Sequence, residues 1–213
     1  MESLDPQVEA YVLAHTQEES PLLKKLNRET NAKILMPKML SGHLQGQVLS
    51  MLSYMIRPQK ILEIGTYTGY SAICLSEGLQ QGGVLHTIDN NEELESMVRY
   101  YFKEALVEEK IHYHIGEAIE IIPGIDAIFD LVFIDADKEN YSKYYDLVFD
   151  KVRAGGYIIA DNVLWSGKVL EDPKNMDEDT KAIYDFNQKI FNDKRVQNVL
   201  FPIRDGLMIA RKK

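Results

Sequence analysis

Two acidic residues and an amide follow two apolar segments that read as neighbouring strands. Asp135 ends the segment Leu131–Asp135, and Asp161 and Asn162 directly follow Tyr157–Ala160. Neighbouring parallel strands bring their carboxyl ends to one edge of a sheet, where ligands bind. Two carboxylates and an amide oxygen form a hard oxygen site that suits Mg²⁺, with Mn²⁺ and Ca²⁺ as alternatives, and disfavours zinc. The other interpretation is that both aspartates only cap the loops that follow the strands.

A glycine-rich turn follows another predicted strand, Lys60–Ile64. The sequence Glu63-Ile-Gly65-Thr-Tyr-Thr-Gly69 differs from the dinucleotide pattern G-x-G-x-x-G because a carboxylate lies near the end of the strand. That carboxylate would repel a pyrophosphate, but it can accept hydrogen bonds from the ammonium group of an amino acid. The turn therefore favours the methionine part of S-adenosylmethionine over NAD, and a plain tight turn is the alternative.

Two further strand ends complete the predicted nucleoside site. Asp89 ends the segment Val84–Asp89, where an acid can accept hydrogen bonds from both ribose hydroxyls. Its alternative role is a helix N-cap, for which Asn90 or Asn91 would serve equally well. The loop Gly116–Ala118, after the next strand, could hold an adenine by its backbone and a small side chain.

The segments that must position these residues alternate along the chain. Beyond Pro58, short apolar runs alternate with amphipathic stretches, which is typical of βαβ units and a mostly parallel sheet. Near the C-terminus a short Asp205-Gly206 connection favours an antiparallel hairpin of Val196–Phe201 with Leu207–Arg211. The other predicted strands are Lys60–Ile64, Val84–Asp89, Ile111–Ile115, Leu131–Asp135 and Tyr157–Ala160, and the predicted helices are Gly69–Gly78, Glu92–Glu108, Ala118–Ile122, Tyr141–Val152 and Thr180–Asn192.

The first part of the chain reads as helical from the spacing of its apolar residues. Ser20-Pro21 starts a helix, Pro37 interrupts the pattern, and Gly42–Gly46 is predicted to be a short loop. We therefore expect a single domain over residues 1–213, with a helical cap over 1–56 and a Rossmann-like core over 57–213.

The composition argues against several classes of protein. No apolar stretch approaches the roughly 20 residues that span a bilayer, and the acidic start of the chain resembles no secretory signal. Cys74 is the only cysteine, so we expect a buried thiol and a cytoplasmic location. The net charge of −9, from 33 acidic and 24 basic residues, disfavours a nucleic-acid partner.

Two histidines, His112 and His114, alternate on the predicted strand Ile111–Ile115. A nitrogen site for a transition metal needs further nitrogen or sulfur ligands, and the neighbouring sequence offers no third one. We therefore interpret both histidines as structural.

Three motifs, EIGTYTGYS, FIDADKENY and DNVLWSG, together resemble the cation-dependent O-methyltransferase family that includes catechol and caffeoyl-CoA O-methyltransferases. The resemblance extends from about Met36 to Arg211 and is nearer to bacterial than to plant members. It implies the class I methyltransferase fold, a Rossmann-like sheet of seven mostly parallel strands with an antiparallel C-terminal strand and helices on both faces. It also implies a homodimer that methylates a small phenolic acceptor, either catechol-type or hydroxycinnamoyl.

The resemblance also implies the residues of the site. The metal ligands would be Asp135, Asp161 and Asn162, and Trp165 would form an aromatic wall beside the acceptor. Ser166, which follows that tryptophan, differs from the asparagine of plant-type members. Contacts with S-adenosylmethionine would come from Ser41, Glu63, Gly65, Ser71, Asp89, Ala118, Asp135 and Asp137, with Ala118 near the adenine and Asp137 near the methionine amine.

Lys138 matches the proposed general base of the family, and Asp135 is the second residue with an implied catalytic role. A phenol with a pKa of about 10 is mostly neutral at pH 7, and a bound cation lowers that pKa. Lys138 could accept the proton, or it could stay protonated and stabilise the phenolate. The plainer alternative is a solvated lysine at the start of a helix.

Three other functions fit part of the pattern. Methylation of a hydroxyuridine in tRNA would use the same catalyst, but the acidic charge balance disfavours it. A non-catalytic nucleoside-binding protein would need no metal ligands. An NAD-dependent reductase would not place a carboxylate in the glycine-rich turn.

Overall fold

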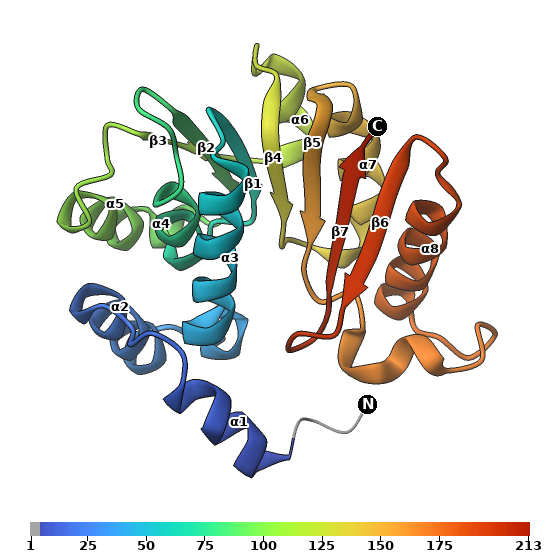
Figure 1. Cartoon of the computed structure of the whole chain (residues 1–213), viewed down its shortest axis with the longest axis horizontal. Helices are drawn as coiled ribbons and strands as arrows, with labels where there is room; N and C mark the ends of the chain where they lie inside the picture. The colour runs from blue at the N-terminus through green and yellow to red at the C-terminus, as the bar shows by residue number, and fades with distance from the viewer. Residues whose placement is uncertain (1–4) are drawn as a thin grey trace. The chain divides into compact units, whose positions relative to one another are not determined.

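A seven-stranded mixed sheet organises the chain (Figure 1). The structure, a computed structural model, describes residues 5–213, so the first four residues of the acidic start lie outside the described part. The strand order is β3-β2-β1-β4-β5-β7-β6. The pairs β1–β4, β2–β3 and β4–β5 are parallel, whereas β7 runs antiparallel to both β5 and β6. The predicted sheet with a reversed final strand is confirmed.

Several predicted boundaries agree with the structure, including those of β1 and β2. The strands are β1 (Lys60–Ile64), β2 (Val84–Asp89), β3 (Ile111–Ile115), β4 (Phe129–Ile134), β5 (Val152–Ala160), β6 (Val196–Phe201) and β7 (Leu207–Lys212). The α-helices are α1 (Pro6–Ala14), α2 (Pro21–Lys33), α3 (Gly42–Ile56), α4 (Tyr70–Ser76), α5 (Glu95–Glu104), α6 (Ala118–Gly124), α7 (Tyr141–Phe149) and α8 (Glu178–Asn192). Short 3-10 helices occur at η1 (Pro37–Met39), η2 (Glu92–Leu94), η3 (Lys138–Asn140) and η4 (Trp165–Leu170).

The described residues form two compact units. The first unit contains Lys60–Gly65 and Glu117–Lys213, and the second contains residues 5–59 and Thr66–Gly116. The predicted single domain with a helical cap and a core stays a prediction. Among the helices of residues 5–213, none combines the length and the apolarity that crossing a bilayer requires.

In the first unit, β4 is the most deeply buried strand. Leu131–Ile134 are all inaccessible to solvent, as expected for a parallel strand that is covered on both faces. Helix α8 packs its apolar stripe, Ile183, Phe186 and Ile190, into the interior of this unit, and Phe191 is its only exposed large apolar residue, at 73%. Most of the apolar face of α8 is therefore not available to a partner, because it is buried within this unit.

In the second unit, α3 and α4 approach each other closely at Gly46. A Cβ atom at Gly46 would lie 2.6 Å from Cε1 of Tyr70 and 2.9 Å from Sγ of the buried Cys74. The predicted loop Gly42–Gly46 is wrong, because these residues form the first turns of α3. Glycine disfavours a helix by about 1 kcal/mol, and here its lack of a side chain is what the packing requires. The predicted helix start at Ser20-Pro21 is confirmed, and Ser20 is the N-cap of α2, since its hydroxyl accepts from the backbone N–H of Leu23 at 3.2 Å.

Candidate active site

The three predicted metal ligands, Asp135, Asp161 and Asn162, are called the oxygen cluster below. Ile134 and Ala160 are in register on β4 and β5, so the residues that follow them leave the sheet side by side. The backbone N–H of Asp161 donates to the carbonyl oxygen of Ile134 at 2.9 Å, which ties the two strand ends together. Asn162 has a left-handed backbone with φ of 57° and turns the chain away from the strand. All three residues belong to the first unit.

Lys138 places its ammonium group among the oxygens of this cluster. Its Nζ donates to Oδ1 of Asp135 at 3.3 Å and to Oδ1 of Asn162 at 3.0 Å. Only 11% of the side chain is exposed, so the interpretation of Lys138 as a solvated lysine is wrong. The cluster is thus arranged around a positive charge, which is the chemistry expected of a cation site.

Tyr141 also lies against Lys138 and the oxygen cluster, although its position in the sequence does not indicate a role. Its hydroxyl accepts from Nζ of Lys138 at 2.6 Å and donates to the backbone carbonyl of Asp161 at 3.1 Å. Burial, followed by the negative charge of Asp135, raises the pKa of the Tyr141 hydroxyl well above its ordinary value. Tyr141 therefore stays a neutral hydroxyl that orients the ammonium group. The spacing of three residues from Lys138 was the available signal, because it places both side chains on one side of a helical turn.

The predicted aromatic wall, Trp165, lies beside the same ammonium group. Nζ of Lys138 is 5.8 Å from the centroid of the indole ring. Asp205 holds the segment around Trp165, where η4 begins. Its backbone oxygen accepts from the N–H of Leu164 at 2.8 Å, and its Oδ1 accepts from the N–H of Ser166 at 2.5 Å. Asp205 belongs to the connection of residues 202–206 between β6 and β7, and the predicted antiparallel hairpin of these two strands is confirmed.

Helix or loop capping does not explain Asp135. The 3-10 helix that follows it has Asp137 at its N-cap position and no side-chain cap. The carboxylate of Asp137 instead accepts from the hydroxyl of Tyr144 and the amide of Asn140. Asp161 does accept from the backbone N–H of Asn162 at 2.7 Å, so a local turn accounts for one of its oxygens.

The first unit also contains the carboxylate and the first glycine of the predicted cofactor turn. Glu63 is fully buried in β1, in register with Phe133 of β4. Gly65 has a φ of +102°, and a Cβ atom there would lie 1.9 Å from the backbone oxygen of Asp135. Only glycine fits this position, because a side chain would overlap the strand end that carries the oxygen cluster. Ala118 is buried at the start of α6.

The predicted ribose ligand, Asp89, lies in the second unit and holds two backbone groups. Its Oδ2 accepts from the N–H of Tyr67 at 2.6 Å and its Oδ1 accepts from the N–H of Asn91 at 2.9 Å. Asn91 is the N-cap of η2, where it accepts from Glu93 at 3.0 Å. The alternative of Asp89 as the helix cap is therefore wrong, and its carboxylate is oriented by the turn.

The rest of the glycine-rich turn is also ordered within the second unit. The N–H of Gly69 donates to the carbonyl oxygen of Thr66 at 2.8 Å. Thr66 and Thr87 share a buried hydroxyl–hydroxyl hydrogen bond of 2.6 Å. The two predicted serines are buried, Ser71 in α4 and Ser41 just before α3. The turn is thus held by hydrogen bonds within the second unit.

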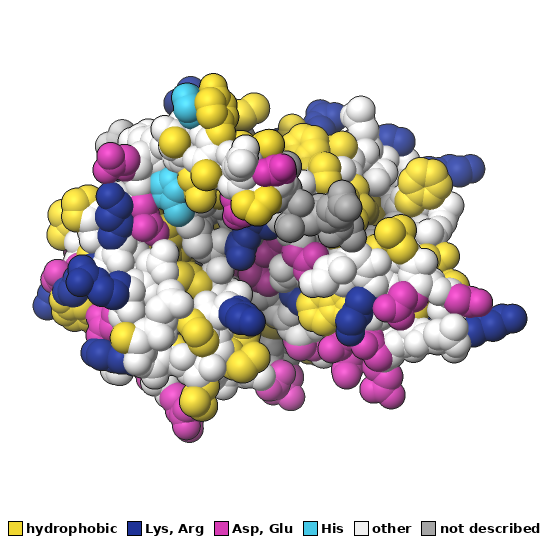
Figure 2. Space-filling model, turned by 90° about the horizontal axis from the view of Figure 1, so that it is seen from below, with side chains coloured by type: hydrophobic (Ala, Val, Ile, Leu, Met, Phe, Trp, Pro, Cys, Tyr) yellow, Lys and Arg dark blue, Asp and Glu magenta, His cyan; other side chains and the backbone are white. Residues whose placement is uncertain are grey.

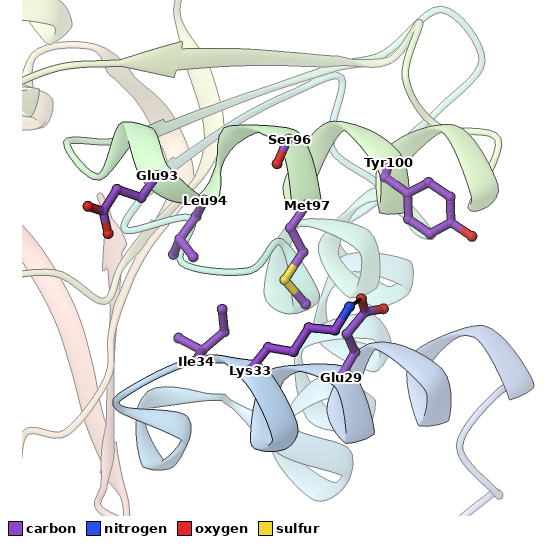
Figure 3. Close-up of a pocket in the computed structure, with 8 residues that line it drawn as sticks. All are labelled: Glu29, Lys33, Ile34, Glu93, Leu94, Ser96, Met97 and Tyr100. Carbon is purple, nitrogen blue, oxygen red and sulfur yellow. Dashed lines mark hydrogen bonds and ion pairs between the residues drawn. The ribbon is translucent and has the colours of Figure 1, made fainter.

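A pocket of about 370 Å³ lies between α2 and the η2–α5 segment of the second unit (Figure 3). One wall carries the ion pair of Lys33 with Glu29, and Met97 points toward it from α5. Its lining consists of Glu29, Lys33, Ile34, Glu93, Leu94, Ser96, Met97 and Tyr100. None of the predicted site residues lines this pocket, so it is separate from the predicted chemistry.

The chain matches the O-methyltransferase family over residues 13–213. It is 33% identical over 207 residues to catechol O-methyltransferase domain-containing protein 1 of Mus musculus, covering 95% of this chain and 78% of the relative. It is 31% identical to a caffeoyl-CoA O-methyltransferase of Medicago sativa, covering 91% and 83%. The crystal structure of the O-methyltransferase TomG from Streptomyces achromogenes, in complex with SAM, superposes with a TM-score of 0.88 at 27% identity and covers 97% of this chain and 96% of TomG.

Proposed function

This chain belongs to the O-methyltransferase family, and from that premise we propose that it methylates a hydroxyl oxygen of a small aromatic acceptor with help from a divalent cation. The predicted S-adenosylmethionine-dependent O-methyltransferase is confirmed by the family match and the cofactor-bound relative. The proposal adds the cation, with Mg²⁺ first and Mn²⁺ or Ca²⁺ as alternatives, and a catechol-type or hydroxycinnamoyl acceptor.

The observation that supports the proposal is the position of Lys138 within the oxygen cluster. Its ammonium group donates to Asp135, Asn162 and Tyr141 at distances between 2.6 and 3.3 Å. Asp135, Asp161 and Asn162 supply oxygen ligands only, which fits a hard divalent cation and leaves positions for water or for the acceptor. These three residues would hold the cation.

When the cation and S-adenosylmethionine are bound, the cation would lower the pKa of an acceptor hydroxyl and S-adenosylmethionine would supply the methyl group. Lys138 lies where it can take the proton of that hydroxyl or, if it keeps its own proton, stabilise the oxyanion. Tyr141 limits the ammonium group to one side of the cluster, and Trp165 offers an aromatic face to an aromatic acceptor. Orienting the reactants in this way can contribute several kcal/mol to lowering the barrier.

The residues proposed to bind S-adenosylmethionine remain those implied by the resemblance. Asp89 would accept the ribose hydroxyls, since the N–H groups of Tyr67 and Asn91 already fix its orientation. Glu63 and Asp137 would face the methionine ammonium group, and Ala118 the adenine. Ser41, Gly65, Ser71 and Asp135 complete the proposed set.

A second copy of this chain is the proposed partner. The helix α1 contains no buried residue, and Val8, Tyr11 and Leu13 on it are exposed. On α3, Met51 and Met55 are also exposed. Apolar residues grouped on helices in this way are typical of surfaces that a partner covers. A dimer mass in sedimentation equilibrium supports this proposal, and a monomer at all concentrations contradicts it.

Charged side chains of both signs are interspersed on the face shown in Figure 2, without one continuous basic surface there. Together with the net charge of −9, this supports a small-molecule acceptor over a nucleic acid. The cytoplasmic location expected from the single cysteine stays a prediction, as does the absence of a membrane partner expected from the lack of a long apolar stretch.

A methyl-transfer screen with and without metal tests the function. Purified chain, S-adenosylmethionine and Mg²⁺ are incubated with catechols, flavonoids, hydroxycinnamates and, separately, tRNA. We expect methylation of an aromatic hydroxyl that is lost in excess EDTA and restored by added Mg²⁺. Equal activity in excess EDTA contradicts the role of the cation, and methylation of tRNA alone contradicts the aromatic acceptor.

A further inference from the structure

Three of the five histidines of the chain gather on one face of the β2–β3 pair in the second unit. His86 of β2 is in register with His112 of β3, and His114 follows two residues later on the same face. His86 adds a third imidazole that the sequence does not reveal, because only the register between the two strands brings it beside His112 and His114. The three residues are called the histidine cluster below.

The imidazole rings of His86 and His114 are spaced like two ligands of one metal ion. Nδ1 of His86 and Nε2 of His114 are 3.0 Å apart, and the two rings are stacked with an interplanar angle of 11°. Two ring nitrogens bound to one ion at about 2.0–2.1 Å lie about 3 Å apart when the angle at the ion is near a right angle. Without an ion, one ring must donate its N–H to the lone pair of the other.

His112 is the movable member of the histidine cluster. Its ring centroid is 4.9 Å from that of His86, with the two rings nearly perpendicular, and its side chain is exposed on a strand at the edge of the sheet. Within residues 5–213, no three histidine, cysteine or acidic side chains already surround one point, so His112 must turn to complete the site. Exposed side chains change rotamer within nanoseconds, which makes this turn accessible.

We propose that the histidine cluster is a second metal site, which binds a borderline transition-metal ion such as Zn²⁺, Ni²⁺ or Cu²⁺. Imidazole nitrogens select these ions, whereas the oxygen cluster supplies ligands that Mg²⁺ prefers. The ion links β2 to β3 three residues before Asp89, where β2 ends. The expected consequence is a second unit that is more stable when the ion is bound.

The test is a Zn²⁺ titration of the full chain without an affinity tag, in the presence of millimolar Mg²⁺, against a chromophoric zinc chelator. We expect one Zn²⁺ per chain to bind at the histidine cluster. Loss of a direct ligand costs at least about tenfold in affinity, so His86→Gln and His114→Gln should each weaken binding by that factor or more. His112→Gln should weaken it by a smaller factor.

Two controls separate this site from others. His15→Gln changes an exposed histidine directly after α1 and should bind Zn²⁺ as the unchanged chain does. Asp161→Ala alters the oxygen cluster and should leave this Zn²⁺ affinity unchanged, so that failure of the proposed function and failure of this site give different results.

A thermal-melting series keeps the test decisive if His86→Gln does not fold. Saturating Zn²⁺ should raise the melting temperature of the unchanged chain and of His15→Gln. It should raise the melting temperature of a double variant, with His112→Gln and His114→Gln combined, much less. The proposal is overturned if that double variant binds Zn²⁺ and is stabilised by it as well as the unchanged chain, or if the unchanged chain binds no Zn²⁺.

Discussion

Three strands of this sheet end in an aspartate or are directly followed by one, and the carboxylates at the ends of β2 and β4 have different partners. Asp89, at the end of β2, accepts from the backbone N–H groups of Tyr67 and Asn91. Asp135, directly after β4, accepts from the ammonium group of Lys138. The first carboxylate is held by neutral donors and the second by a cation, although the sequence signal, an acid at a strand end, is the same.

The neighbouring strand accounts for this difference. The strand β3 beside β2 ends at Ile115 and is followed by Gly116, which carries no side-chain oxygen. The strand β5 beside β4 is followed by Asp161, only 3% exposed, and by Asn162. Two close carboxylates repel each other and are stable as a charged pair only near a positive charge. Acids on two adjacent strand ends therefore predict a cation site, whereas an acid on one strand end does not.

The largest effect should come from removing one carboxylate of the oxygen cluster. Asp161→Ala should lower kcat/KM by about 10³ or more, because a bound cation supplies several kcal/mol of stabilisation in the transition state. Affinity for S-adenosylhomocysteine, measured by calorimetry, should survive. The control is Asp126→Ala, an exposed aspartate of the same unit. Full activity of Asp161→Ala would contradict the claim that the oxygen cluster holds a catalytic cation.

Gly65→Ala should destabilise the fold by about 3 kcal/mol, the sum of a left-handed backbone penalty and a steric overlap. The added Cβ atom would lie 1.9 Å from the backbone oxygen of Asp135. Urea unfolding measures the change. Gly124→Ala is the matched control, since a Cβ atom there meets nothing within 4 Å. A loss no larger than that of the control would show that the end of β4 does not depend on this glycine.

Lys138→Ala should lower kcat by about 10², the usual size of general acid–base or charge stabilisation by one side chain, with a smaller change in KM. Lys138→Arg separates the two roles, because arginine keeps its charge and cannot act as a base at ordinary pH. Recovery of most of the activity in Lys138→Arg indicates stabilisation of the oxyanion. An unchanged pH–rate profile in Lys138→Ala counts against the base role.

Asp89→Asn should weaken S-adenosylhomocysteine binding by about tenfold, since hydrogen bonds to a charged group contribute roughly 1.5–3 kcal/mol. Metal binding should not change, because no cation is expected at this strand end. Calorimetric titrations with the nucleoside and with Mn²⁺ measure both affinities. Loss of Mn²⁺ binding in Asp89→Asn would show that the end of β2 also takes part in binding the cation.

Asn91→Ala should have the smallest effect, about 1 kcal/mol of stability, the usual cost of removing an N-cap. The side chain of Asn91 accepts from Glu93, and its backbone N–H donates to Asp89. Since the backbone N–H remains, nucleoside affinity should fall only slightly. Ser20→Ala, which removes the cap of α2, is the control. A drop in nucleoside affinity as large as that of Asp89→Asn would show that Asn91 itself binds the ligand.

Local patterns predicted the strands and their ends well. The boundaries of β1, β2 and β3 agree with those expected, because each is an apolar run bounded by turn residues. β5 begins five residues before the predicted Tyr157, since Gly155 and Gly156 interrupt the apolar pattern without ending the strand. The helical start of α3 at Gly42–Gly46 was missed because its glycines are selected by packing against α4, which local sequence does not show.

Side-chain partners were predicted less completely than strand ends. The register of β4 with β5 brings Asp135 and Asp161 together as expected. The roles of Tyr141 and of His86 depend on contacts that form only after the chain has folded, one across a helical turn and one across two strands. The resemblance to a family indicated the chemistry of the site. The structure identified which neighbours, such as Tyr141, hold the charged side chain of Lys138 in place.

The central claim is that the oxygen cluster holds a divalent cation and that the end of β2 does not. Mn²⁺ binding, followed by electron paramagnetic resonance at micromolar concentrations, measures this directly in the unchanged chain, Asp161→Ala and Asp89→Asn. We expect one bound Mn²⁺ per chain in the unchanged protein and in Asp89→Asn, and almost none in Asp161→Ala. Mn²⁺ bound by Asp161→Ala with undiminished affinity would contradict it.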